Sequence, residues 1–124
     1  MAEAKEYIVH SEAGGSINIS EEVVAVIAAT ALLDVAGAYV PGATKVNGSP
    51  SLDRKHLGKV VKLNFDQSNP DCVSITCSLL VTYGSVILDV ATAVQNAVKD
   101  TVEGVTGLKV TAVDVNVYGI SFQN

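Results

Sequence analysis

The side chains best suited to chemistry are few in this sequence, and their spacing does not favour a reaction. The chain has two histidines, His10 and His56, and the residues around each are typical of loops. A Ser-His-acid or Cys-His site needs a base held beside its nucleophile, and neither histidine has such a neighbour in the sequence. We therefore predict no catalytic residue.

The two cysteines also favour a structural role. Cys72 and Cys77 lie five residues apart in one predicted strand, so their side chains point to opposite faces and cannot form a disulfide. They lack the C-x-x-C spacing and the second ligand pair of a zinc site. Glycine-rich phosphate-binding motifs are missing from the sequence as well. We predict reduced thiols, no metal and no cofactor.

One carboxylate, Asp34, interrupts an otherwise apolar helical stretch. It either lies at the edge of the helix and reaches water, or is buried with a raised pKa and a function. No catalytic partner lies nearby in the sequence. An enzyme that uses Asp34 or His56 is therefore a weaker hypothesis than either a protein-contact scaffold or an anion-binding regulator.

The charge pattern limits the class of partner. Thirteen acids and eight bases give a net charge of −5, which disfavours DNA binding. Five bases nevertheless lie between Lys45 and Lys62. One interpretation is a solvated loop, and the alternative is an anion site that binds RNA or anionic lipid. Its residues would be Arg54, Lys55, His56 and Lys59.

The N-terminal residues contain no apolar signal-peptide core, so we expect a cytoplasmic protein. The most apolar run, 23–40, is interrupted by Thr30, Asp34 and Gly37. Its uninterrupted parts are shorter than the roughly 20 residues that span a bilayer. We therefore expect no transmembrane helix.

Apolar periodicity defines the elements that must position any site. A long amphipathic helix is predicted from Ser85, as its cap, to Thr106, with Gly107 ending it. The strand after it changes parity twice, which predicts bulges near Thr111–Ala112 and at Gly119. Alternation over 61–66 and 73–83 predicts an antiparallel hairpin.

An earlier helix is predicted to begin after the cap Ser20 and to end near Gly37. A short strand around Ile17 and Ile19 precedes it, and a long loop follows Pro41. We expect residues 1–15 to be flexible and 16–124 to form a single domain, which the length of 124 residues fits. The expected fold is α+β, in two layers. A mixed sheet carries the two main helices on one face, in the order β-α-(β)-β-β-α-β.

The first helix is apolar on both sides. Val26 and Leu33 lie almost opposite its core-facing arc, on the same side as Ala25 and Ala29. Either neighbouring segments cover this side, or it is a contact surface. Leu88, on the polar side of the second helix, favours the contact surface. Val26, Leu33 and Leu88 are the predicted protein-contact residues.

The order of these features resembles the bacterial alkaline shock protein family, also called the envelope stress response family. The resemblance rests on the sequences GSINISEEVVAVIAATALLDVAGAYV over 15–40 and TYGSVILDVATAVQNAVKDTVEGVTGLKVTAVDVNVYGISF over 82–122. It implies a cytoplasmic, non-enzymatic scaffold or adaptor linked to cell-envelope stress. It also implies a homo-oligomer and a membrane-anchored partner protein. Gly104 and the Gly/Ser/Pro-rich stretch after Pro41 depart from many relatives.

Overall fold

The computed structural model describes residues 7–12, 14–41, 44–46, 49–51, 54–66, 68 and 71–122. Side chains are described over 14–41, 57–66, 68 and 71–122. The elements in chain order are β1 (Tyr7–Glu12), β2 (Gly15–Ser20), α1 (Glu21–Leu33), β3 (Ala38–Tyr39), β4 (Thr44–Val46), β5 (Ser49–Ser51), α2 (Arg54–Val60), β6 (Val61–Phe65), β7 (Cys72–Thr82), α3 (Ile87–Thr106) and β8 (Lys109–Ser121).

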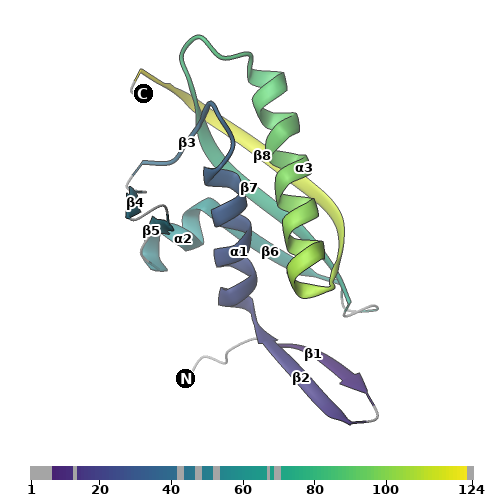
Figure 1. Ribbon diagram of the computed structural model, residues 1–124. Coiled ribbons are helices and arrows are strands. Elements are labelled where there is room, and N and C mark those ends of the chain that lie inside the picture. The colour runs from purple at the N-terminus through teal and green to yellow at the C-terminus, as the bar shows by residue number, and fades with distance from the viewer. Residues whose placement is uncertain are drawn as a thin grey trace.

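The main sheet is built around β7. β6 pairs with its first half and β3 with its last residues, both antiparallel. β8 runs parallel to β7 along its whole length, so it occupies the opposite edge. α1 and α3 pack side by side on one face of this sheet (Figure 1). The predicted mixed sheet with two main helices on one face is confirmed.

The core forms between β7, where every second residue is buried, and α3, where every fourth residue is buried. Alternate β7 residues from Val73 to Val81 are buried, while Ser74, Thr76 and Ser78 are half-exposed. Four valines spaced four residues apart on α3 are also buried: Val90, Val94, Val98 and Val102. Burying each valine contributes roughly 1.5–3 kcal/mol.

Both predicted bulges of β8 are confirmed. Against β7, Thr111 is an extra residue between Val110 and Ala112, and Tyr118 is extra between Val117 and Gly119. Each extra residue shifts the alternation by one place, which is why the apolar residues change parity in the sequence. At Gly119 the Leu80 side chain occupies the space of a Cβ, since its Cδ2 would lie 2.7 Å away.

The helix ends follow the predictions in part. Ser20 caps α1 by accepting a hydrogen bond from Val23 N–H, and Gly107 ends α3 with a φ of 77°. However, α1 ends at Leu33 with Asp34 as its C-cap, and Gly37 lies in the following turn. Ser85 is not the cap of α3, because its N–H bonds to Thr82 O within a turn and the helix begins after Val86.

The expected strand around Ile17 and Ile19 exists, but it belongs to a hairpin. β2 pairs antiparallel with β1, and the hairpin projects from the start of α1 (Figure 1). His10 therefore lies in a strand, where a loop was expected. The flexibility of residues 1–15 stays a prediction, and residues 1–6 and 13 lie outside the described part.

The stretch after Pro41, expected to be a long loop, contains β4, β5 and α2. α2 is stabilised by packing, because its Leu57 and Val60 are buried in the common core and it contacts α1. Ala25 and Ala29, on the outer side of α1 in the prediction, are buried too. Neighbouring segments therefore cover this part of the helix, which was one of the two explanations.

Candidate functional site

The end of the domain between β7 and α3 exposes a group of large apolar side chains. We call it the apolar end, and it consists of Tyr83, Val86, Ile87, Leu88 and Phe122. Their exposed fractions range from 44% for Ile87 to 77% for Leu88 and Phe122. Monomeric proteins rarely expose large contiguous apolar patches, and such patches mark contact sites.

A tight turn fixes the geometry of the apolar end. Gly84 adopts a φ of 97°, and Ser85 N–H donates to Thr82 O at 3.0 Å. Tyr83 N–H donates to Ser121 O at 2.7 Å and so ties the turn to the end of β8. The Tyr83 and Phe122 rings stack with centroids 5.1 Å apart. These side chains are therefore held in place before any partner arrives.

The three predicted contact residues have different surroundings. Leu88 belongs to the apolar end. Val26 is 47% exposed on α1, and Val23 beside it is similarly exposed. Leu33 is half-buried and packs against the core. α1 begins at the hairpin end of the domain and α3 at the opposite end, so the structure does not bring Val26 and Leu88 together (Figure 1).

Sequence reasoning singled out only Leu88 of the apolar end. The signal for the rest was the run of three apolar residues from Val86 to Leu88 at the start of a helix. Consecutive helical residues lie about 100° apart, so all three cannot face the same core. Phe122 had no such signal, because its stacking on Tyr83 depends on the parallel pairing of β7 and β8.

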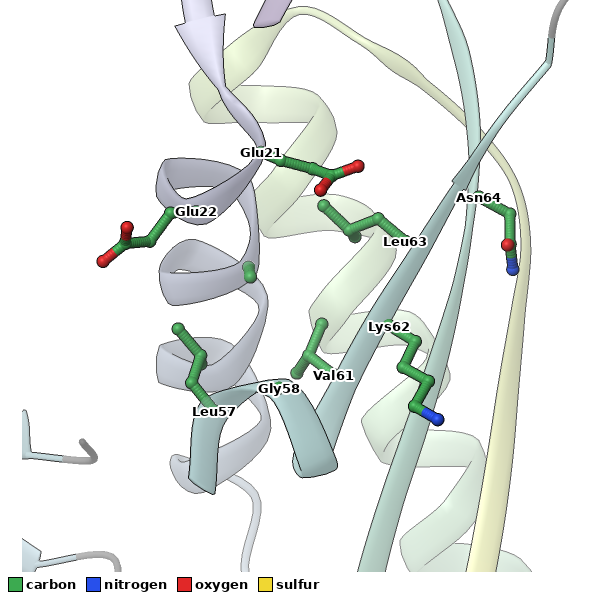
Figure 2. Close-up of a pocket in the computed structure, with 9 residues that line it drawn as sticks. Glu21, Glu22, Leu57, Gly58, Val61, Lys62, Leu63 and Asn64 are labelled. Atoms are coloured by element: carbon green, nitrogen blue, oxygen red, sulfur yellow. The ribbon is translucent and has the colours of Figure 1, made fainter. Parts of the chain in front are cut away.

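A groove with a volume of about 510 Å³ lies between α1, α2 and β6. Ala25, Leu57, Val61 and Leu63 give it apolar walls (Figure 2). Glu21 points toward Leu63, whereas Glu22 and Lys62 point away from the groove (Figure 2). Its described lining residues include no histidine, cysteine or serine, so they offer no Ser-His or Cys-His pair.

Comparison with known proteins identifies the family of this chain. The sequence model of the alkaline shock protein family, a family with a cell envelope-related function, matches residues 9–122. The chain belongs to this family. Two Bacillus subtilis relatives are similar to it. The uncharacterized protein YloU is 30% identical over 113 residues, which cover 89% of this chain and 92% of YloU. The uncharacterized protein YqhY is 29% identical over 109 residues, which cover 87% and 78%. No solved structure matches.

The other candidate residues of this alkaline shock family chain do not form a site in the described part. Asp34 is exposed, so its interpretation as a water-facing residue is confirmed and a buried carboxylate is wrong. Lys59 is exposed on α2. The side chains of Arg54, Lys55 and His56 lie outside the described residues, so anion binding stays a prediction. Among the described residues, no three His, Cys, Asp or Glu side chains cluster as metal ligands. No helix there is long and apolar enough to cross a membrane.

The predicted free thiols are confirmed, since Cys72 and Cys77 are buried and unpaired with each other. Burial raises the pKa of the Cys77 thiol from 9.0 to about 12. Only the thiolate is a nucleophile, and at pH 8 this shift leaves about a thousandfold less of it. Cys77 is therefore an unreactive core residue.

The raised pKa of Cys77 makes the fold sensitive to alkali. The folded protein keeps this proton up to about pH 12, whereas the unfolded chain loses it above pH 9.0. The free energy of unfolding should therefore fall as pH rises through this window, by about 1.4 kcal/mol per pH unit from this group. Urea unfolding from pH 8 to 11 should show a shallower fall for Cys77→Ala. Equal slopes would contradict the assignment.

Proposed function

We propose that this alkaline shock family protein is a non-enzymatic scaffold that self-associates and takes part in cell-envelope stress homeostasis through protein contacts. The apolar end carries the proposal. Its large apolar side chains are strongly exposed, and two of them, Tyr83 and Phe122, stack on each other. Side chains of this kind form the buried centre of interfaces. The cell envelope-related function of the family supports the setting.

The energetics of the apolar end favour association. Burying one large apolar side chain contributes roughly 1.5–3 kcal/mol, and Leu88 and Phe122 are each 77% exposed before contact. Association loses part of this gain in ordering flexible side chains. The Tyr83 hydrogen bond and the stacked rings already order Tyr83 and Phe122, so less of the gain from these two side chains is lost.

The net charge suggests how such a scaffold reaches the envelope. A chain with a net charge of −5 is repelled by anionic lipid. We propose that it works in the cytoplasm and is held at the membrane by a membrane-anchored partner protein. Val23 and Val26 on α1 offer a second exposed apolar surface for that partner, away from the apolar end.

Leu88→Asp tests this function. A charge within the apolar end should weaken self-association at least about tenfold, since loss of a single interface anchor commonly costs about 2 kcal/mol or more. Sedimentation velocity over a range of protein concentrations measures the change. Thr92→Asp, which adds the same charge at an exposed position one turn later on α3, is the matched control and should sediment like the wild type.

If the wild type remains a monomer at every concentration, self-association is wrong. If the wild type associates and Leu88→Asp associates equally well, the apolar end is not the contact surface. Circular dichroism of both variants should match that of the wild type, because neither side chain is part of the buried core.

A further inference from the structure

β8 is a long strand with an open outer edge. It has 13 residues, and in the described part of the chain its only strand neighbour is β7. The outer edge of such a strand presents backbone N–H and C=O groups that another strand can pair with. Which of these groups are available depends on the two bulges.

The bulges determine which residues face outward. Lys109 N–H donates to Asp71 O at 2.8 Å, so the backbone N–H and C=O of Lys109 point toward β7. Those of Val110, the next residue, therefore point to the outer edge. The extra residues Thr111 and Tyr118 each reverse this alternation. At the far end Ser121 O accepts from Tyr83 N–H, which agrees with two reversals. The residues whose backbone N–H and C=O point to the outer edge are therefore Val110, Val113, Val115, Val117 and Ile120.

Two side chains of α3 close the first part of this edge. Glu103 Oε2 accepts from Val110 N–H at 2.9 Å, and Gln95 Nε2 donates to Val113 C=O at 2.9 Å. In the described residues, no comparable contact reaches Val115 or Val117. The C-terminal end of β8 also lies well apart from the first turn of α3 (Figure 1). The open section of the edge is therefore 114–120.

We propose that this open section pairs with β8 of a second copy, antiparallel, around a two-fold axis at Asn116. The inference rests on the proposed self-association and adds the edge of β8 to the apolar end as a contact surface for it. Val115 of each copy exchanges hydrogen bonds with Val117 of the other, which gives four backbone hydrogen bonds. The two sheets become one continuous sheet, with the helices of both copies on the same face.

Other registers are less favourable. A two-fold axis at Val115 would pair Val117 with Val113, whose C=O is already bound by Gln95. An axis at Val117 would pair Val115 with Gly119, whose backbone faces β7. An axis at Asp114 would place two carboxylates directly opposite each other, which is destabilising. With the axis at Asn116, Asp114 instead lies opposite Tyr118 of the second copy, and the two amides of Asn116 face each other.

A charge swap at Asn116 tests this register. Asn116 is exposed, so Asn116→Asp and Asn116→Lys should both fold normally. Each should weaken self-association about tenfold, because like charges then meet directly across the two-fold axis. An equimolar mixture of the two variants should restore association to within about threefold of the wild type. Asn96→Asp and Asn96→Lys, on the exposed side of α3, are the matched controls and should associate like the wild type.

The outcomes separate this inference from the proposed function. If the wild type associates and the Asn116 variants associate equally well, pairing at β8 is wrong while a scaffold remains. If both variants weaken association and their mixture does not restore it, residue 116 does not face itself, and the register is wrong. A wild type that is always monomeric would overturn the scaffold and the pairing together.

Discussion

Val94→Asp will unfold the domain. Val94 is fully buried in α3, and the surrounding core consists of apolar side chains. The change removes the roughly 1.5–3 kcal/mol contributed by the buried valine and adds the larger cost of an unpaired buried charge. Domains of this size are stable by only about 5–15 kcal/mol. Circular dichroism should show the loss of the cooperative thermal transition.

Ala93→Asp is the matched control. It introduces the same side chain one residue earlier in α3, at a position exposed to solvent. Its thermal midpoint should stay close to that of the wild type, because an exposed substitution usually changes stability by less than about 0.5 kcal/mol. A Val94→Asp protein that melts cooperatively near the wild-type temperature would show that the packing of α3 on the sheet is wrong.

Gly37→Val should have the second largest effect on stability. Gly37 has a φ of 91°, a backbone conformation that residues other than glycine rarely adopt. A Cβ there would lie 2.8 Å from Val90 Cγ2 and 3.0 Å from Ser85 Oγ. Backbone strain and overpacking each cost about 1–3 kcal/mol, so the free energy of unfolding should fall by about 3 kcal/mol or more. The midpoint of urea unfolding measures this fall.

Gly104→Ala should act in the opposite direction. Gly104 lies within α3, it is exposed, and a Cβ there would meet nothing within 4 Å. Alanine should stabilise the helix by about 0.5–1 kcal/mol. If Gly37→Val and Gly104→Ala changed stability by similar amounts, the close approach of the α1–β3 turn to α3 would be contradicted.

The main layers of the fold could be predicted because each has a strong local signal. Strict alternation along β7 and the valines spaced four apart on α3 specify which faces are buried. The two parity changes after Lys109 located both bulges, since an extra residue necessarily shifts a period of two. Ser20 and Gly107 were also correctly predicted as helix ends, because both act through local hydrogen bonding or backbone conformation.

Elements that depend on distant contacts were missed. α2 is seven residues long and contains Gly58, so its local helix propensity is weak, and the burial of Leu57 and Val60 stabilises it. β1 was missed for a local reason, because Tyr7–Glu12 shows little apolar alternation, although its partner β2 follows it directly. The early end of α1 was missed as well, because Val35 and Gly37 read as a continuation of the helical pattern.

The candidate surfaces could be predicted only in part. Leu88 and Val26 are exposed apolar residues, but the pattern could not separate them from Leu33, which packs against the core. Gln95 and Glu103 looked like ordinary solvated residues of α3. Their contacts are with the backbone N–H of Val110 and the backbone C=O of Val113, which point to the outer edge of β8. Neither contact has a signal in the sequence.

The central claim is that the chain works by associating with itself through surfaces prepared in the fold. The most direct test is the weight-average mass of the wild-type protein, measured by sedimentation equilibrium over a wide range of concentrations. We predict a mass that rises with concentration to at least twice that of one chain. A mass that stays at the value for one chain at every concentration would contradict this account.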